Sequence, residues 1–256
     1  MPISFVIDMD GVIYHGNRLI PGALDFVERL RVGGHKFLFL TNNSQLTPRD
    51  LKHKIDQMGI AVDESAFHTS ALATADFLKQ QKPGGTAYVI GGAGLTHALY
   101  SVGYTLTEHN PDYVVVGDTR SYDFEKIESA IRLILKGARF VATSLDLTGP
   151  SEHGIQPACG ALVAPIELAT GRKPYFVGKP NALMMRTALR KLGAHSAEAF
   201  MVGDRMDTDI VAGYEAGMRT ILVLSGVTTR EMIDHYPYLP TLVYEDVGHI
   251  PVDQLQ

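Results

Sequence analysis

The sequence predicts an α/β protein in which a doubly wound, mainly parallel sheet is interrupted by a second, inserted α/β domain. Short β-branched apolar runs alternate with amphipathic stretches along the chain, and two glycine- and proline-containing groups, Lys82–Gly85 and Gly171–Pro174, break that alternation. Apolar strands joined by helices favour a parallel sheet that is covered on both faces. We therefore expect a Rossmann-like core in two parts, residues 1–81 and 175–256, around an inserted α/β domain over residues 82–174.

The first core part begins with the apolar run Ile3–Ile7, which predicts a strand, and continues with a stretch over Ala23–Arg31 whose apolar residues have helical spacing. Thr47 and Ser70 are expected to cap the next two helices, and Pro48 suits a first helical position. The expected elements of this part are strands over residues 3–7 and 36–40 and helices over 23–31, 47–58 and 70–81.

The same alternation predicts the elements of the other two parts. In the inserted domain we expect strands over residues 87–90, 113–116 and 139–142 and a helix over 124–135. In the second core part we expect strands over residues 175–177, 199–202 and 220–224 and helices over 182–192 and 208–216.

Composition excludes several classes of protein. The chain has 256 residues, 45% of them hydrophobic, and a formal charge of -5, which is typical of a globular protein with a sizeable core. It has no apolar run of about 18 residues for a membrane helix and no basic cluster for nucleic acid polymers. We expect no export signal, because Met1–Ser4 lack the basic start and small-residue cleavage site of one. The lone Cys159 excludes a disulfide scaffold. We expect a cytoplasmic protein without membrane or nucleic-acid partners, and the sequence leaves an oligomer open.

Polar side chains follow four of the predicted core strands, at the point where each strand ends. In an open α/β sheet, ligands bind outside the carboxyl ends of the strands, so these residues are expected to share one crevice. Two groups are acidic, one combines a hydroxyl with amides, and one is a single lysine. The groups are Asp8 and Asp10; Thr41, Asn42 and Asn43; Lys179; and Asp204, Arg205, Thr208 and Asp209.

The acids Asp8, Asp10 and Asp204 together suit a hard divalent cation. Packed negative charges at a strand end are costly unless a cation neutralises them. An EF-hand calcium loop that begins at Asp8 is excluded, because its sixth and twelfth positions need Gly and Glu but hold Ile13 and Leu19. Mg²⁺ is the expected cofactor, since it commonly takes one or two carboxylates and completes its shell with water and substrate phosphate.

Such a site suits phosphoryl transfer through an aspartyl-phosphate. One carboxylate attacks phosphorus, and a second carboxylate two residues away protonates the leaving oxygen and later deprotonates water. Asp8 and Asp10 have that spacing. Thr41 and the amides of Asn42 and Asn43 supply donors for the phosphate oxygens.

Several of these residues have simpler interpretations when each is taken alone. Lys179 suits a solvated surface lysine, Asp209 suits the first turn of a helix, and Thr41 suits a turn hydroxyl. Their places at neighbouring strand ends favour the shared site.

Two other sequence features carry no cofactor site. The turn Gly91–Gly94 follows a predicted strand, but a dinucleotide fingerprint needs a glycine where this chain has His97, so we expect a tight turn there. A P-loop is absent around Lys179, because Pro180 stands where that motif needs Ser or Thr. Cys159 is expected to pack as a small apolar side chain.

The four polar segments, in this order, resemble the four motifs of the haloacid dehalogenase superfamily of phosphatases. The matching residues are Asp8-x-Asp10-Gly11, Thr41, Lys179 and Gly203-Asp204-x-x-x-Thr208-Asp209. The insertion, with Thr41–Asn43, Tyr175–Pro180 and Pro157–Leu162, is similar to the NagD-like branch, whose members carry a large α/β cap there.

The resemblance implies a role for each residue. Asp8 would be the nucleophile and a metal ligand, Asp10 the acid/base and a ligand through its backbone carbonyl, and Asp204 the third ligand. Thr41, Asn42 and Lys179 would hold the phosphoryl group. Asp209 would support these residues without contacting the substrate itself, and Arg205 to Thr208 would line the substrate.

The resemblance also implies a phosphatase whose cap closes over a small phosphorylated metabolite. Two cap segments are the candidates for contacting the substrate beyond its phosphate: Thr143–Asp146, in which Asp146 is singled out, and Gln156–Gly160. Nucleoside monophosphates such as UMP are the leading substrates. Sugar phosphates, phosphoglycolate, pyridoxal phosphate and aryl phosphates remain alternatives. A phosphotransferase and a non-catalytic phosphate-ligand sensor are the rival functions.

Overall fold

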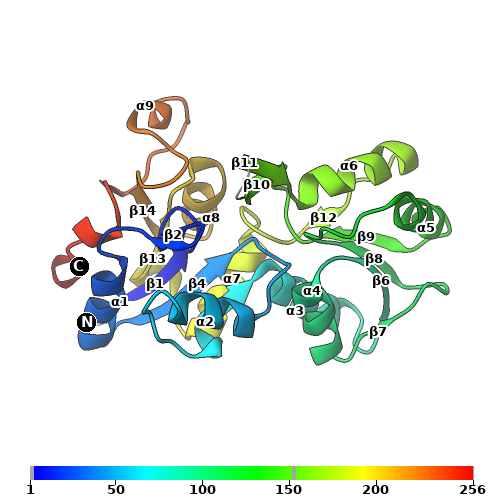
Figure 1. Cartoon of the computed structure of the whole chain (residues 1–256), viewed down its shortest axis with the longest axis horizontal. Coiled ribbons are helices and arrows are strands. Elements are labelled where there is room, and N and C mark those ends of the chain that lie inside the picture. The colour runs from blue at the N-terminus through cyan, green and yellow to red at the C-terminus, as the bar shows by residue number, and fades with distance from the viewer. Residues whose placement is uncertain (1–2, 152–153, 256) are drawn as a thin grey trace. The chain divides into compact units, whose positions relative to one another are not determined.

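The computed structural model describes residues 3–151 and 154–255, and its contacts divide into two compact units. The first unit holds the chain up to Thr41, the stretch Leu51–His68 and the chain from Lys179 onward. The second unit holds Asn42–Asp50 and Thr69–Gly178. Each unit contains a parallel sheet with helices between its strands, as the ribbon in Figure 1 shows. The predicted fold class is confirmed.

The first unit is built on a six-stranded sheet with the strand order β15-β14-β13-β1-β4-β5. Every residue of β1 and β13 is buried. Because successive side chains point to opposite faces of a sheet, both faces must be covered. The strands are β1 (Ser4–Asp8), β4 (Lys36–Thr41), β5 (Phe67–Thr69), β13 (Ala199–Gly203), β14 (Arg219–Val223) and β15 (Leu242–Tyr244).

The strand order of this sheet reverses beside β1. The chain passes from β1 to β4 and β5 on one side and then returns to β13, β14 and β15 on the other. Parallel pairing sets Asp8 beside Leu40 and Ile7 beside Val202. The residues that follow these strands therefore meet at one carboxyl edge, at the reversal where open α/β sheets bind ligands.

The helices of the first unit largely follow the prediction. They are α1 (Ala23–Val32), α7 (Ala182–Leu192), α8 (Val211–Glu215), α9 (Arg230–Ile233) and the larger part of α2 (Pro48–Asp56). The helix expected over 208–216 begins earlier, as a π-helical turn η3 (Met206–Ile210), because the amide of Ile210 bonds to the carbonyl of Arg205, five residues back, at 3.1 Å.

The second unit is built on a five-stranded, wholly parallel sheet with the order β12-β9-β8-β6-β7. Its strands are β6 (Thr86–Ile90), β7 (Thr105–Leu106), β8 (Tyr113–Val116), β9 (Arg139–Ala142) and β12 (Tyr175–Phe176). Its helices are α3 (Ser70–Gln81), α4 (Ala93–Ser101), α5 (Phe124–Leu135) and α6 (Cys159–Thr170), and β10 (Thr148–Ser151) pairs antiparallel with β11 (Gly154–Pro157).

One predicted core strand belongs to this second sheet. The expectation that residues 175–177 form a core strand is wrong, because Tyr175 pairs with Val141 of β9 and its ring lies 5.0 Å from that of Phe77 in α3. Helix α3 and both glycine-containing linkers thus fall inside the second unit. The inserted domain over 82–174 stays a prediction, since the contact units divide the chain at other positions.

Local capping explains two helix starts. The hydroxyl of Thr47 accepts a hydrogen bond from the amide of Asp50, as expected of an N-cap. The prediction that Ser70 caps α3 is wrong by one residue, because Thr69 accepts from the amide of Leu72 while the hydroxyl of Ser70 donates elsewhere.

Several elements were not predicted from the sequence: the strands β5, β7 and β15, the helices α4, α6 and α9, the antiparallel pair β10–β11, and the hairpin of β2 (Tyr14–His15) and β3 (Arg18–Leu19). Within the described part of the chain, none of the helices combines the length and apolar character needed to cross a membrane.

Candidate active site

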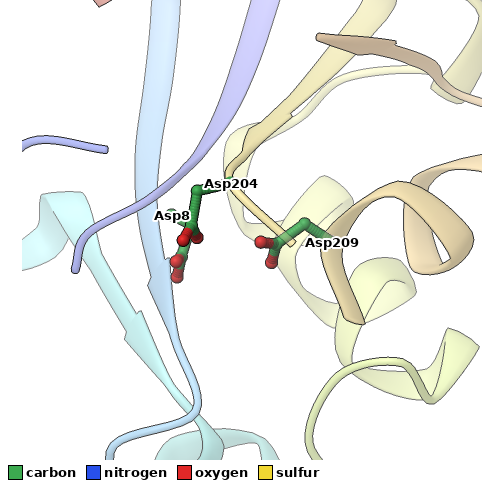
Figure 2. A group of neighbouring side chains, drawn as sticks. All are labelled: Asp8, Asp204 and Asp209. Carbon is green, nitrogen blue, oxygen red and sulfur yellow. The ribbon is translucent and has the colours of Figure 1, made fainter. Parts of the chain in front are cut away.

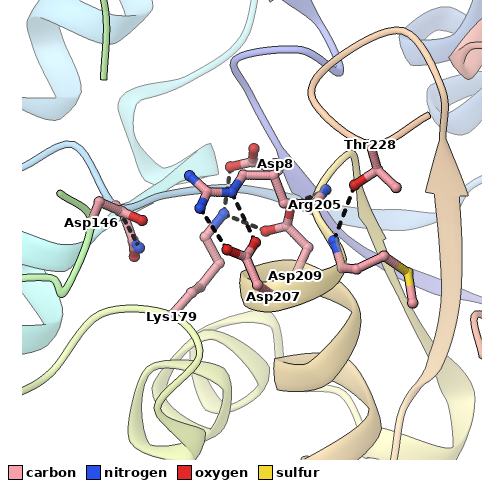
Figure 3. A network of polar contacts seen from close by, with 9 residues as sticks. Asp8, Asp146, Lys179, Arg205, Asp207, Asp209 and Thr228 are labelled. Carbon is pink, nitrogen blue, oxygen red and sulfur yellow. Dashed lines mark hydrogen bonds and ion pairs between the residues drawn. The ribbon is translucent and has the colours of Figure 1, made fainter. Parts of the chain in front are cut away.

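A buried lysine joins two aspartates at the carboxyl edge of the first unit's sheet. The Nζ of Lys179 lies 2.6 Å from Oδ1 of Asp8, at the end of β1, and 2.6 Å from Oδ1 of Asp209, in η3. All three residues are buried, and Figure 3 shows both contacts. The alternative of a solvated surface lysine is therefore wrong for Lys179, which is 3% exposed.

Asp204 completes an acidic group with Asp8 and Asp209. One carboxylate oxygen from each of the three lies within 4.8 Å of the others. Figure 2 shows Asp8 and Asp204 close together, with Asp209 directed toward them from η3. Asp204 follows β13 directly, and its Oδ2 accepts a hydrogen bond from the amide of Val227 at 2.7 Å.

Glycines make room for these carboxylates. A Cβ added to Gly226 would lie 2.0 Å from Oδ2 of Asp204, and one added to Gly11 would lie 2.6 Å from the same atom. A Cβ added to Gly203 would lie 2.2 Å from the Cβ of Asp209. Gly11 also adopts a φ of 81°, which side-chain-bearing residues rarely adopt.

The electrostatics of this group favour a bound cation. Burial raises the pKa of Asp8 well above its ordinary value, although Lys179 opposes the rise. Burial, with a further contribution from Asp209, raises the pKa of Asp204 to about 7. Burial would lower the pKa of Lys179, but Asp209 and Asp8 reverse that effect and raise it. Three acids thus share a single buried ammonium, and their mutual repulsion is only partly offset.

The donor set fits a hard divalent metal ion. The Oδ1 of Asp204 is buried, and among the described residues no hydrogen-bond donor reaches it. A buried carboxylate oxygen without a partner is costly, and a cation ligated by carboxylate oxygens would satisfy it. The acidic cluster can therefore hold a metal ion.

Asp10 lies apart from that side-chain cluster. Its side chain is 40% exposed, and its carboxylate is 3.7 Å from the ring of His15. Burial raises the pKa of Asp10, and the positive charge of Lys54 opposes the rise. Asp10 is expected to contact the metal through its backbone carbonyl. The position of its side chain outside the acidic group therefore does not test that expectation.

The residues after β4 divide between the two units. Thr41 is buried at the end of β4, one residue beyond the partner of Asp8. Asn42 and Asn43 belong to the second unit, where the side-chain amide of Asn42 donates to Oδ2 of Asp146 at 2.8 Å. Asn42, which was expected to bind phosphate, and Asp146, which was expected in the cap, thus bind each other.

The residues expected to line the substrate differ in exposure. The guanidinium of Arg205 forms a two-pronged ion pair with Asp207, at 2.9 and 3.0 Å. Thr208 is 2% exposed, so its side chain packs inside the unit. Their contact with substrate stays a prediction.

Sequence inspection missed one loop of the site. The segment Ser225–Thr228 supplies the Val227 amide to Asp204, the Ser225 hydroxyl to the carbonyl of Gly11 at 2.7 Å, and space at Gly226. This segment follows β14, which was predicted. Its place after the carboxyl end of a predicted core strand, where open α/β sheets bind ligands, is the sequence signal that marks it.

Comparisons with known proteins agree with this geometry. A family model described as haloacid dehalogenase-like hydrolase matches residues 5–105, and a second model of the same kind, HAD-hydrolase-like, matches residues 176–250. The chain is 50% identical to the dihydroxyacetone phosphatase of Corynebacterium glutamicum, over 97% of this chain and 90% of that protein. It is 46% identical to the ribonucleotide monophosphatase NagD of Escherichia coli K12, over 97% and 98% of the two chains. The chain belongs to the haloacid dehalogenase-like hydrolase family.

Other relatives in this family are also phosphatases. The acid sugar phosphatase of Staphylococcus aureus is 39% identical over 96% of this chain and 95% of that protein. The solved structure of NagD from E. coli K-12 superimposes with a TM-score of 0.93 at 45% identity, covering 98% of this chain and all of that one. The resemblance inferred from the four motifs is confirmed, and the chain is a phosphomonoester hydrolase of this family.

Proposed function

We propose that this enzyme hydrolyses small phosphomonoesters through an aspartyl-phosphate formed on Asp8, with Mg²⁺ as cofactor. The observation that supports this most directly is the position of Lys179, buried between Asp8 and Asp209 at the carboxyl edge of the sheet. A carboxylate held against a lysine at a strand end would supply a nucleophile beside a positive charge that binds phosphate.

In the first step, a carboxylate oxygen of Asp8 attacks phosphorus. A bond forms between that oxygen and phosphorus, and the bond from phosphorus to the ester oxygen breaks. Asp10 gives its proton to the departing oxygen, and its raised pKa favours the protonated form that this step needs. Lys179 and Thr41 hold the phosphoryl oxygens as charge develops on them.

In the second step, water attacks the phosphorus of the aspartyl-phosphate. The bond from phosphorus to Asp8 breaks, inorganic phosphate leaves, and Asp10 recovers a proton from the water. Asp8, Asp204 and the backbone of Asp10 would hold Mg²⁺, which would neutralise phosphate charge. Asp209 keeps the ammonium of Lys179 beside Asp8 through its contact at 2.6 Å.

The substrate is a small phosphorylated metabolite, with nucleoside monophosphates such as UMP as our leading candidates. Support comes from the relative named as a ribonucleotide monophosphatase. A triose phosphate is the second candidate, because the relative at 50% identity is named as a dihydroxyacetone phosphatase. The cytoplasmic location and the lack of membrane and nucleic-acid partners stay predictions from the sequence.

A phosphate-release screen tests this proposal. The purified enzyme with Mg²⁺ is supplied with UMP and other nucleoside monophosphates, dihydroxyacetone phosphate, sugar phosphates, phosphoglycolate, pyridoxal phosphate and p-nitrophenyl phosphate. We expect phosphate release without any added acceptor and the highest kcat/KM on a nucleotide or a triose phosphate. Release that needs an acceptor would indicate the phosphotransferase, and binding without release would indicate the sensor.

A further inference from the structure

Another segment of the chain packs against the glycine-rich turn Gly91–Gly94, which the sequence did not reveal. The second sheet reverses its strand order between β6 and β8, with β7 on one side and β9 and β12 on the other. Open α/β sheets bind their ligands beside such a reversal. In this unit the place is taken by part of the chain itself, residues 42–46, called the 42–46 segment below.

The backbone of the 42–46 segment lies against the turn. The amide of Gly94 donates to the carbonyl of Gln45 at 2.8 Å. A Cβ added to Gly94 would lie 2.5 Å from the carbonyl oxygen of Leu46 and 2.6 Å from that of Ser44. The expected tight turn is therefore the start of helix α4, and its glycine admits a neighbouring chain segment at the position where a dinucleotide fold admits pyrophosphate.

Asp118, at the end of β8, holds the same segment from the other side of the reversal. Its Oδ2 accepts hydrogen bonds from the amide of Ser44 at 3.1 Å and from its hydroxyl at 3.0 Å. The amide of Asp118 donates back to that hydroxyl oxygen at 2.8 Å, and the hydroxyl of Thr143 donates to it at 3.0 Å. Ser44 is fully buried, so these bonds are sheltered from water.

The other oxygen of this carboxylate fixes a second part of the unit. Oδ1 of Asp118 accepts from the amide of Cys159, the first residue of α6, at 2.9 Å. One side chain thus joins the end of β8, the 42–46 segment and the start of α6. The carboxylate of Asp118 accepts all three of these hydrogen bonds, two from Ser44 and one from Cys159.

We propose that Asp118 is a positioning residue for phosphate binding. It fixes Ser44, and Ser44 fixes the backbone that presents Asn42 and Asn43. This inference rests on the proposed function and on the sequence-based expectation that Asn42 and Asn43 help to hold the phosphoryl group. Misplacement of such groups by about 1 Å is enough to lower turnover by about 100-fold.

The test is Asp118→Asn, compared with Asp112→Asn. An amide at position 118 has only one acceptor oxygen, so an NH₂ group must face either Ser44 or the amide of Cys159. Asp112, at the other end of β8, makes the same pattern of bonds. Its Oδ2 accepts from the amide and hydroxyl of Thr86 at 2.9 and 3.0 Å, and its own amide donates back at 3.0 Å. It makes none of the measured contacts with the 42–46 segment, which makes it a matched control.

Four quantities are measured with Mg²⁺ present: kcat and KM for p-nitrophenyl phosphate, the inhibition constant of inorganic phosphate, and the amide exchange rate of a peptide covering the 42–46 segment. We expect Asp118→Asn to raise the inhibition constant and lower kcat/KM by about 10-fold or more, with faster exchange in that peptide. Asp112→Asn should leave the inhibition constant of phosphate and kcat/KM within about twofold of the values for the unmodified enzyme.

Three further variants make the outcome decisive. Ser44→Ala removes only the hydroxyl and should reproduce the effect of Asp118→Asn, so it replaces that variant if Asp118→Asn does not fold. Asn42→Ala should weaken phosphate binding, and adding Asp118→Asn to it should cause little further loss. If Asn42→Ala weakens phosphate binding while Asp118→Asn and Ser44→Ala behave like Asp112→Asn, the positioning role is overturned and the proposed function stands. Failure of the unmodified enzyme to release phosphate would overturn the proposed function instead.

Discussion

Gly226 lies so close to Asp204 that a Cβ added to it would stand 2.0 Å from the carboxylate oxygen Oδ2. That same oxygen accepts the hydrogen bond from the amide of Val227. The carboxylate can therefore hold its position only because residue 226 lacks a side chain. A loop after β14 thus shapes the acidic group, whose members lie at the end of β1, directly after β13 and in η3.

We expect Gly226→Ala to displace Asp204 and to lower kcat/KM by at least about 10-fold, because the group that would bind the metal shifts. Gly149→Ala is the control, since among the described residues a Cβ there would meet nothing within 4 Å, and its backbone has no positive φ. Steady-state kinetics at several Mg²⁺ concentrations provide the measurement. Equal kinetics for the two variants would show that the close approach at Gly226 has no functional consequence.

Asp8→Asn should abolish turnover and leave the fold intact. The substitution removes the attacking oxygen and one negative charge but hardly changes the volume. We expect a loss of more than about 1,000-fold in phosphate release, the scale on which nucleophile removal acts. Thermal unfolding should show a folded protein, because the side chain still fills its place beside Lys179. Substantial activity in this variant would rule out the aspartyl-phosphate.

Removal of divalent metal should silence the enzyme, and Mg²⁺ should restore it. Independently of activity, Mg²⁺ should raise the unfolding temperature, because a cation that binds only the folded state stabilises it. The rise should shrink in Asp204→Asn, which removes one charge of the acidic group. Undiminished hydrolysis in EDTA would contradict the metal assignment, and so would an unfolding temperature that does not change when Mg²⁺ is added.

The buried, neutral state of His68 predicts that the protein loses stability below neutral pH. The residue is buried, and burial lowers its pKa to about 3, with the charge of Lys191 acting in the same direction. Because Thr187 donates its hydroxyl hydrogen to the carbonyl of Met184, the ring must donate through Nε2 to Thr187, at 2.9 Å. The neutral form with hydrogen on Nε2 is therefore the form that fits the fold.

The sign of the pH effect follows from proton uptake. Between pH 6.5 and about pH 3 the unfolded chain binds a proton at His68 and the folded chain does not, so stability falls as pH falls. Each pH unit in this window should cost about 1.4 kcal/mol. Urea unfolding at pH 7.5 and pH 5 should show a smaller decrease for His68→Gln than for the unmodified protein. The exposed His97→Gln is the control, and identical decreases in all three would count against the prediction.

Strand ends were the most predictable part of the site. The apolar run before Asp8 specifies a buried central strand, and the parallel arrangement brings Asp8, Thr41 and Asp204 to one edge. These relations follow from local patterns and the general geometry of parallel sheets. Lys179 was also predicted, although the strand before it pairs in the other sheet.

Other features escaped prediction because their causes are not local. Two-residue strands such as β12 leave no recognisable period, and their sheet is chosen by partners such as Val141. The cap of α3 is Thr69 and not Ser70 because the chain geometry at its start gives Thr69 the amide of Leu72. The role of Gly94 depends on a segment about fifty residues away in the chain.

The sequence by itself determined the fold class, the family, and the acids and lysine at the strand ends, since strand patterns and short motifs are encoded by neighbouring residues. Only the tertiary structure decided that Lys179 bridges Asp8 and Asp209, that Gly226 makes room for Asp204, and that Asp118 binds the 42–46 segment. These contacts join residues far apart along the chain, and their distances arise only when the sheets pack. Spacing along a sequence carries no record of such distances.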